Sequence, residues 1–483
     1  MRPRRRLTVA AACAFVAAGL LYNAWVPVQF LNPGVGPPGG YVSELAAADQ
    51  PWSWLVRLGD VLAGIACLAA VALVPDERPG RWGAAGWFGL ALFGGMTVLD
   101  GFSPLTCASL SDPLCAAAEA TGQVPLSHRL HAVFSTLALT GAVISLLTLP
   151  VSARRRRRWP LIGYGGAASA VLMAVATVWT LAAIASGGPV GVAQRFQIGA
   201  VTLWLLLVGA ALWRDRTVAA PPKAHVLVEG AGTPPVLICA GMAGAWFHWD
   251  RVAADLSRDH EVIRFDRPGL GLSSGHRGAP TLREEAGRIG ALAVSPVSPV
   301  PPVVVGHSVA GRHAEAFARL RPGRVTGLVL VDPSCEPEAR PRRRSRAAVV
   351  RAVQRALPAL GGTFGATAVA YLVLPLGHRL VMGADDRARG VYGRGRVLAA
   401  AVAEWLAYPD MAAELFELRR THPFPRIPVV ILSAGPEDRC HRDLAELLNA
   451  TLISLPDVGH EVQLERPGAI AEAVRTLGRF HDM

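Results

Sequence analysis

The 483-residue chain is 52% apolar and only 17% charged. These proportions exclude a single soluble domain and indicate at least two units. The formal charge of +12 would suit a nucleic-acid partner, but the arginines gather in short clusters beside apolar runs, where anionic lipid headgroups would meet them. We therefore expect membrane lipids, and no nucleic acid, as partners.

Residues 1–215 contain six apolar runs, each long enough for a transmembrane helix. The first, from Leu7 to Phe30, can cross a hydrocarbon core of about 30 Å at roughly 1.5 Å per residue. It follows a basic leader, as in a signal peptide, but no small-residue cleavage site comes after it, so we expect a retained anchor. The others cover 54–75, 82–104, 129–150, 159–186 and 193–213. The sequence thus predicts an all-α, six-helix transmembrane bundle.

The arginine distribution orients these spans, because positive segments near helix ends resist translocation. Arginines occupy the leader, the link between spans two and three, the run Arg154 to Arg158, and the segment after span six. Acidic residues occupy the alternate loops. The pattern predicts a multi-pass protein of the cell membrane with both chain ends, and any domain after span six, in the cytoplasm.

Two features stand near the expected outer ends of the spans. Cys107 and Cys115 either form a disulfide or are two ordinary small residues, and we weigh these readings equally. A set of ionisable residues is either an ion, proton or metal site or a salt-bridge cluster that holds the bundle. We favour the salt-bridge cluster and expect no metal, because the spacing of a metal motif is missing. The set comprises Asp60, Asp100, His128, Arg129 and His131.

The segment NPGVGPPGGYVSELAA after span one and HRLHAVFS in span four resemble a multi-pass bacterial family known only as a domain of unknown function. This resemblance covers about 1–215 and implies no activity.

After a linker at 216–223 the pattern changes to short Val/Ile/Leu runs separated by Gly/Pro turns and helix-like stretches. Such alternation is typical of a mostly parallel sheet with helices on both faces. It predicts a second unit over 224–483. The expected strands cover 224–229, 234–240, 261–266, 302–307, 325–332, 428–434 and 451–455.

The fourth of these runs ends abruptly in GHSVAG, residues 306–311. A buried strand that turns sharply into a helix needs small residues on both sides of the turn, and the strained turn lifts the central serine out. Ala310 replaces the second glycine of the usual G-x-S-x-G pattern, a mild departure because alanine is small. Ser308 is therefore the candidate nucleophile.

At this point the chain resembles the α/β-hydrolase superfamily, in particular its esterase, lipase and peptidase-like members. Three further segments carry the resemblance: VLICAGMAGAWFHWDRVAADL, DRPGLGLSS and VGHEVQLERPGAIAEAV. The resemblance implies an α/β-hydrolase fold with a helical lid, here about 333–425, that sets specificity. No cofactor is expected.

His460 is the candidate base, because a serine hydroxyl is a poor nucleophile until an imidazole takes its proton. It follows a strand-like run and precedes a closing helix, as the base of the family does. The neighbouring residue of the elbow, His307, and the helix-starting His441 are less suited to this role.

The imidazole needs a carboxylate to hold its tautomer, and two carboxylates compete. Four residues separate Asp438 from the run VVILS, and its position matches the common chain order Ser, Asp, His. Asp332 ends the run GLVLVD and occupies an alternative position used by some members. We favour Asp438, keep Asp332 as the alternative, and place Glu437 third.

The negative charge of a tetrahedral intermediate needs preorganised N–H donors. The backbone amides of Met242 and Val309 are those that the first loop and the elbow would supply. The nearby Trp246 and Trp249 either wall an acyl pocket or pack in the core.

The expected lid opens with a basic cluster beside an amphipathic helix, which can lie on an anionic inner leaflet or form a solvated face. Its apolar run 364–377 is too short for a span and is broken by Pro375, so we expect a lid helix or an acyl-tunnel wall. The cluster comprises Arg340, Arg342, Arg343, Arg344 and Arg346.

Together these features predict a membrane-tethered serine hydrolase that cleaves a small-molecule carboxylic ester or a lipid. The alternatives are a transporter-like or sensor-like protein whose hydrolase-fold domain only binds a ligand, and a peptidase or haloperoxidase-type activity on the same fold. Dehalogenases and epoxide hydrolases place a carboxylate at the elbow, so Ser308 argues against both. Neither the substrate nor the oligomeric state follows from the sequence.

Overall fold

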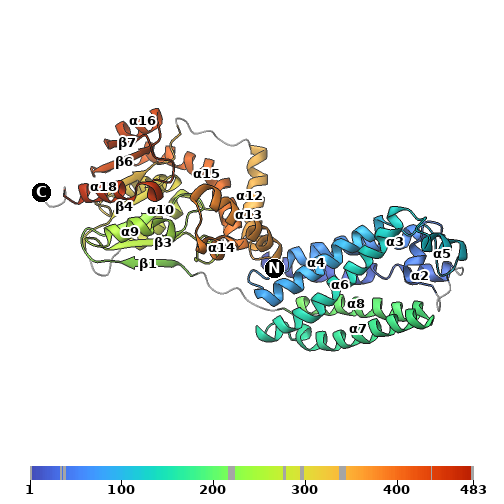
Figure 1. Ribbon diagram of the computed structural model, residues 1–483. Coiled ribbons are helices and arrows are strands. Elements are labelled where there is room, and N and C mark those ends of the chain that lie inside the picture. The colour runs from blue at the N-terminus through green and yellow to red at the C-terminus, as the bar shows by residue number, and fades with distance from the viewer. Residues whose placement is uncertain are drawn as a thin grey trace. The chain divides into compact units, whose positions relative to one another are not determined.

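The long apolar runs and the short strand-like runs fold into two separate units (Figure 1). In the computed structural model the first unit comprises residues 1–219 and 363–365, and the second comprises residues 220–362 and 366–483. The structure describes residues 3–32, 35, 40–215, 223–275, 279–293, 299–336, 344–436 and 438–479. Most of the expected linker lies outside these ranges, as do Arg340, Arg342, Arg343 and Glu437.

The first unit is all α. Its long helices are α1 (Pro3–Leu21), α3 (Ser53–Leu73), α4 (Gly80–Phe102), α6 (Leu126–Arg155), α7 (Pro160–Ser186) and α8 (Val190–Trp213). Three short elements accompany them: α2 (Trp25–Leu31), the 3₁₀ helix η1 (Val42–Ala46) and α5 (Pro113–Ala120). The expected first span is interrupted after Leu21, and α5 was not expected. The other five helices begin and end within a few residues of the expected runs.

Small residues let these helices approach closely, as in other membrane bundles. A Cβ atom on Gly89 of α4 would lie 2.6 Å from the carbonyl oxygen of Gly141 on α6, and one on Gly141 would lie 2.5 Å from that of Gly89. Large side chains such as Trp87 and Trp204 fill the remaining interior and are fully buried. A disulfide joins Cys107 and Cys115 (Cα–Cα 5.9 Å), which selects one of the two readings of this pair.

Seven helical segments of the described chain are long and apolar enough to cross a membrane. Six lie between Arg4 and Trp213, where α1 and α2 together make up one of them. The seventh is Phe364–Met382, which belongs to the second unit from Ala366 onward. How many of the seven cross a bilayer stays a prediction.

The second unit is built on a seven-stranded sheet in the order β1-β3-β2-β4-β5-β6-β7, and only β1 runs antiparallel to its neighbour. All seven expected strands are present. They are β1 (His225–Glu229), β2 (Val236–Cys239), β3 (Val262–Asp266), β4 (Val303–His307), β5 (Gly327–Val331), β6 (Val429–Ala434) and β7 (Thr451–Leu455).

Helices cover both faces of this sheet, because alternate apolar residues of each central strand point to opposite sides. On β5, Leu328 and Leu330 pack with one set of helices, whereas Val329 and Val331 pack with the other. The first set is α10 (Leu282–Leu292), α11 (Val309–Leu320), α15 (Gly395–Thr421) and α16 (Arg439–Leu448). The second is α9 (Asp250–Leu256), α17 (Val462–Glu465) and α18 (Pro467–Arg479).

The segment between β5 and β6 is a helical insertion. It contains α12 (Arg344–Leu360), α13 (Phe364–Met382), α14 (Asp386–Tyr392) and α15. The expectation that Pro375 breaks the apolar run was wrong, because α13 continues through Pro375 to Met382 and reaches a length of 19 residues. That this insertion acts as a lid stays a prediction.

Candidate active site

The register of the sheet brings two of the candidate residues together. His307, the last residue of β4, pairs with Val331, the last residue of β5. The next residue on each strand is Ser308 and Asp332, respectively. Both therefore leave the same edge of the sheet on neighbouring strands, where parallel α/β folds place their sites.

The turn at Ser308 is strained, with φ of 52° and ψ of −121°. Such a conformation persists only where its surroundings enforce it. The N–H of Ser308 donates to the carbonyl of Val331 (3.0 Å), and its carbonyl accepts from the N–H groups of Gly311 and Ser334 (3.0 Å each). The hydroxyl is left at the surface of the turn, 3.5 Å from the Oγ of Ser334.

The expected oxyanion loop closely approaches this turn. A Cβ atom on Gly241 would lie 2.5 Å from Nδ1 of His307 and 3.3 Å from the Cβ of Ser308, so a glycine lets the backbone before Met242 come so near. Val309 is the first residue of α11, whose N–H has no carbonyl partner within the helix. The donors expected at Met242 and Val309 thus belong to two segments that meet at Ser308.

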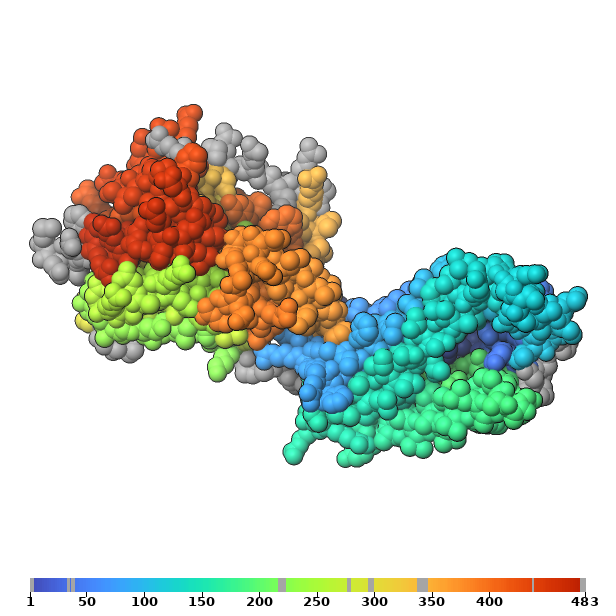
Figure 2. Space-filling view, in the orientation of Figure 1, coloured from blue at the N-terminus to red at the C-terminus, as the bar shows by residue number. Residues whose placement is uncertain are grey.

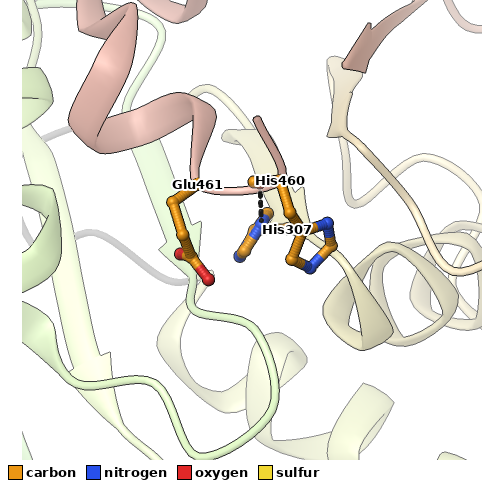
Figure 3. A group of neighbouring side chains, drawn as sticks. All are labelled: His307, His460 and Glu461. Atoms are coloured by element: carbon orange, nitrogen blue, oxygen red, sulfur yellow. Dashed lines mark hydrogen bonds between the residues drawn. The ribbon is translucent and has the colours of Figure 1, made fainter. Parts of the chain in front are cut away.

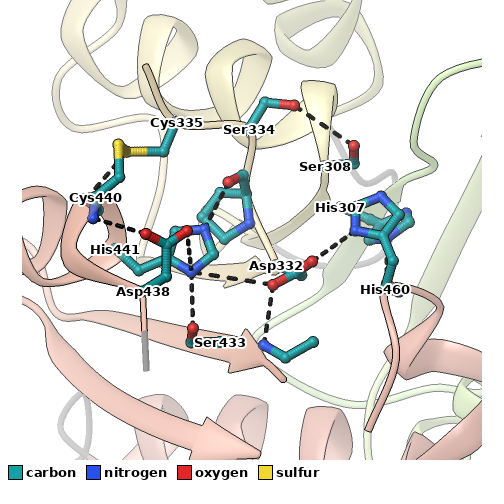
Figure 4. Close-up of polar contacts among 12 residues, drawn as sticks. His307, Ser308, Asp332, Ser334, Cys335, Ser433, Asp438, Cys440, His441 and His460 are labelled. Atoms are coloured by element: carbon teal, nitrogen blue, oxygen red, sulfur yellow. Dashed lines mark hydrogen bonds and ion pairs between the residues drawn. A yellow bond between two sulfur atoms is a disulfide. The ribbon is translucent and has the colours of Figure 1, made fainter. Parts of the chain in front are cut away.

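His460 lies in the loop between β7 and α17, and its partner is Asp332. Its Nδ1 lies 2.5 Å from Oδ2 of Asp332, while Oδ1 of Asp332 accepts from the N–H of Ala434 (2.9 Å). The carbonyl of His460 accepts from Nε2 of His307 (2.9 Å). Figure 4 shows the bond from the imidazole of His460 to the carboxylate of Asp332, and the contact of the Ser308 hydroxyl with Ser334.

Asp438, the acid that we favoured, caps a helix instead. Its Oδ1 accepts from the N–H of Cys440 (2.8 Å) at the start of α16, and its Oδ2 lies 4.0 Å from His441. His460 therefore contacts the alternative carboxylate, Asp332, and not the favoured Asp438, while the identity of the acid stays a prediction. The two strand ends lie side by side in the fold, and chain order alone could not decide which carboxylate reaches the imidazole.

The charges of the site follow from these contacts. Burial alone would raise the pKa of Asp332, but the hydrogen bonds from His460 and Ala434 outweigh it and hold this pKa below its usual value. The same bond to Asp332 raises the pKa of His460. Burial, together with the nearby His460, lowers the pKa of His307 to about 4. Near neutral pH, His307 is thus uncharged and acts as a donor that holds the loop of His460.

His307, His460 and Glu461 place three potential metal ligands within 4.8 Å of one another, the only such group among the described residues (Figure 3). Nε2 of His307 and Nδ1 of His460 are already engaged by the carbonyl and the carboxylate described above. Nδ1 of His307 faces Gly241, where a Cβ atom would lie only 2.5 Å away. We therefore assign this group to hydrogen bonding rather than to a metal.

A buried ion pair that sequence reasoning missed supports the oxyanion loop. Arg267 follows β3, and its Nε donates to Oε1 of Glu404 on α15 (2.6 Å). Its two terminal nitrogens donate to the carbonyls of Ala240 and Gly241. Glu404 in turn accepts from the N–H of Ala243 (2.9 Å). Arg267 belongs to the DRPG segment quoted above, whereas no motif marks Glu404.

A second disulfide, also missed, lies beside Asp332. It joins Cys335, in the segment after β5, to Cys440 at the start of α16 (Cα–Cα 6.0 Å). The two cysteines are 105 residues apart, so sequence spacing carried no signal. An open cavity of about 450 Å³ lies beside this bond and is lined by Asp332, Ser334 and His460, among others.

The two expected wall residues differ in their surroundings. Trp249 is fully buried in the core on one face of the sheet, which favours the packing interpretation. Trp246 is partly exposed and packs against His225 and Phe247, with ring centroids 4.7 and 5.1 Å away.

Comparison with known families agrees with this architecture. A family model described as "Alpha/beta hydrolase family" matches residues 230–473, about half of the chain, and the chain belongs to this family. Residues 15–211 match a family described as "Protein of unknown function (DUF998)", a membrane-type region. No curated protein matches significantly.

Solved structures resemble the second unit in fold alone. The enol-lactonase from Burkholderia xenovorans is 21% identical, with 53% of this chain and 96% of that chain covered and a TM-score of 0.40. A thermophilic esterase from Thermogutta terrifontis is 23% identical, with coverage of 55% and 96% and a TM-score of 0.39. The thioesterase domain from the curacin biosynthetic pathway is 15% identical, with coverage of 53% and 95% and a TM-score of 0.42.

The contacts of His460 predict different effects for the two carboxylates. Asp332→Asn should lower kcat by about 10⁴, because the imidazole loses its orienting carboxylate. Asp438→Asn should cost far less. The raised pKa of His460 places the acid limb of kcat/KM at higher pH than for an ordinary histidine, since the base must be neutral. Asp332→Asn should move that limb to lower pH.

Steady-state pH profiles of the purified full-length variants check both effects. A large loss with Asp438→Asn, together with an unshifted acid limb in Asp332→Asn, would return the acid role to Asp438.

Proposed function

We propose that the second unit is a serine hydrolase that cleaves a carboxylic ester through an acyl-enzyme. The observation that carries this proposal is the pairing of His460 with Asp332 next to the strained turn of Ser308. The hydrolase family supplies the reaction class, and the residue roles are inferred from these contacts.

In the first half of the reaction, the Oγ of Ser308 attacks the ester carbonyl while Nε2 of His460 takes the hydroxyl proton. Asp332 accepts a hydrogen bond from Nδ1–H and stabilises the imidazolium. The N–H groups of Met242 and Val309 stabilise the oxyanion, a contribution of about 3 kcal/mol per donor in other serine hydrolases. Collapse of the intermediate expels the alcohol, which takes the proton from His460.

In the second half, His460 removes a proton from water, which attacks the acyl group on Ser308. The carboxylic acid leaves, and the serine hydroxyl regains its proton from His460. Every step uses the described side chains and water, so the reaction requires no cofactor.

Two alternatives remain on the same fold. Peptidase chemistry would use the same Ser308, His460 and Asp332. A domain that only binds a ligand would not need a carboxylate-held imidazole beside the serine turn, whereas an acyl-enzyme mechanism needs both.

A fluorophosphonate probe applied to membranes that contain the protein should label Ser308, because only an activated serine reacts with it. Mass spectrometry of the labelled peptide locates the adduct, and the Ser308→Ala protein should stay unlabelled. Ser334→Ala is the matched control, since Ser334 lies 3.5 Å away and should leave labelling intact. An adduct on another residue, with ester hydrolysis retained in Ser308→Ala, would refute the assignment.

We further propose that α13 rests in lipid, which would bring membrane esters to the enzyme. This helix lies on the insertion, part of the orange surface in Figure 2. A contiguous set of exposed apolar side chains, such as the one on α13, marks an interaction surface. Arg346, Arg351 and Arg355 are exposed on α12 and could each contribute about 1 kcal/mol at an anionic surface. The apolar side chains of α13 that are more than half exposed are Val369, Leu372, Val373, Leu376, Leu380 and Val381.

A fluorophore on a cysteine introduced at Leu372, with Cys13, Cys335 and Cys440 replaced by serine, should be quenched by lipids that carry a quencher in the acyl chain. The same fluorophore at Leu447 of α16, which is also more than half exposed, should not be quenched. Measurements on the full chain in bilayers test this. Equal quenching at the two positions, or none at Leu372, would contradict the proposal.

The cytoplasmic location of the hydrolase unit is also a proposal. The arginine pattern supports it. With six spans, however, the two disulfides would lie on opposite sides of the membrane, and disulfides persist mainly on the oxidising side. We propose that Cys107 and Cys115 lie on the oxidising side of the membrane and form a disulfide. Cys335 and Cys440 would then lie on the reducing side, and we expect them to be thiols in the cell.

A reporter that is active only after export should therefore stay silent when fused after Met483. In cells quenched with acid, Cys335 and Cys440 should react with a maleimide without prior reduction. A strong reporter signal, with both cysteines protected until reduction, would place the hydrolase unit outside.

A further inference from the structure

The ionisable set expected in the first unit does not form one cluster. His128 bonds to Thr106 through Nδ1 (2.9 Å to Oγ1), away from the other members. Asp60, Asp100 and His131, in contrast, line a common cavity of about 240 Å³. These three residues come from α3, α4 and α6.

The cavity lies at one end of the bundle. Asp100 is near the end of α4, and His131 is near the start of α6. Residues of η1 and the start of α8 also line it, including Val42, whose N–H donates to Oε1 of Gln194 (2.6 Å). The short helices α2 and α5 lie at this same end (Figure 1). The arginine pattern assigns this end to the outside.

Asp100 and His131 form an ordered pair. Nδ1 of His131 lies 3.0 Å from Oδ1 of Asp100 and 3.2 Å from the carbonyl of Ser103. Both neighbours are acceptors, so Nδ1 carries the proton and Nε2 of the neutral ring is an acceptor. Ser135 donates to the two oxygens of Asp100 (3.0 Å each).

Several polar groups that line the cavity have no partner. Nε2 of His131 and Nε1 of Trp25 are buried and make no hydrogen bond to any described residue, although both side chains are at least nine-tenths buried. Asp60 is partly exposed, lines the same cavity and has no hydrogen-bond or ion-pair partner among the described residues. The two buried atoms, Nε2 of His131 and Nε1 of Trp25, are unusual, because each unpartnered buried polar atom costs about 1–3 kcal/mol.

These groups define the chemistry of an occupant. Of the described residues that line the cavity, none is Lys or Arg, while two are carboxylates. Asp60 and Nε2 of His131 are hydrogen-bond acceptors, so they would bind N–H groups of a cationic occupant. Nε1–H of Trp25 is a donor and would bind an acceptor atom of the same occupant. Tyr22, Trp25 and Phe93 add aromatic walls, which favour ammonium groups. The volume far exceeds the roughly 15 Å³ that holds one water.

A bare metal ion fits less well. The oxygens of Asp100 are already engaged by Ser135 and His131. Asp60, Asp100 and His131 also do not converge as ligands, because the only described group of three that does so is in the other unit.

We propose that this cavity binds a small amine that carries a neighbouring oxygen acceptor, with Asp60 as the counter-ion of its ammonium group. Trp25 donates to the oxygen, and His131, held by Asp100, accepts from the ammonium. An amino alcohol has this chemistry, either as a free molecule or as a lipid headgroup.

Ethanolamine is the probe for the test, with binding to the full-length protein in phosphatidylglycerol nanodiscs measured by calorimetry and by the rise in melting temperature. Saturable binding is expected. Asp60→Asn should weaken it about tenfold or more, as the loss of a charged hydrogen-bond partner does. Asp49→Asn removes an exposed carboxylate that does not line the cavity and should leave binding unchanged.

The oxygen contact is tested separately. Trp25→Phe keeps the ring and removes the N–H, so it should weaken ethanolamine but not ethylamine, which has no oxygen. If phosphatidylethanolamine in the nanodisc competes with ethanolamine, the source is a lipid headgroup; if it does not, the source is the free amine.

Three results would overturn the proposal: no saturable binding of ethanolamine, equal stabilisation by ethylene glycol, or unchanged affinity in an Asp60→Asn protein that melts as the parent does. If Asp60→Asn does not fold, Trp25→Phe decides through its selectivity between the two amines.

Discussion

The hydrogen bond between His460 and Asp332 is the contact on which the proposed chemistry depends. It joins the loop between β7 and α17 to the end of β5. Burial favours the neutral forms of both Asp332 and His460, and the hydrogen bond opposes this effect on the pKa of each group. The bond lowers the pKa of Asp332, which favours its anion, and raises the pKa of His460, which makes it a stronger base. It is available only because β4 and β5 end in register, which puts Ser308 and Asp332 side by side.

The helical insertion holds the loop beside Ser308 through Glu404 and through Tyr392, whose hydroxyl donates to the carbonyl of Ala243. Glu404 on α15 holds Arg267, and together they bind three backbone groups of the loop from Ala240 to Ala243. Breaking a buried pair of this kind costs about 3–5 kcal/mol, because the remaining charge stays buried. The position of the oxyanion loop is therefore tied to the insertion, although α15 is remote from it in sequence.

Local patterns predicted most of the architecture. The sequence predicted all seven strands, the helix runs of the first unit and the serine turn, because each depends on periodicity or on small residues at a turn. The first span was not expected to break after Leu21, and Pro375 was wrongly expected to break the apolar run 364–377, which lies within the continuous helix α13. Helix interiors tolerate proline where other contacts compensate, and the sequence alone does not reveal these contacts.

The missed features of the site depend on long-range contacts. Asp332 and Asp438 both follow strands, and only the three-dimensional path of the loops decides which one meets His460. The partners Arg267 and Glu404 are 137 residues apart, and Cys335 and Cys440 are 105 apart. Pairs at such separations leave no periodic signal in a single sequence.

Partitioning by an added nucleophile tests the central claim, a covalent acyl group on Ser308, most directly. The enzyme would hydrolyse two esters of one acid that differ only in the alcohol, in water that contains methanol. A common acyl-enzyme predicts the same ratio of methyl ester to free acid from both substrates, whatever the leaving alcohol. A ratio that changes with the leaving alcohol would mean that water attacks the ester directly, and the account of Ser308, His460 and Asp332 would fail.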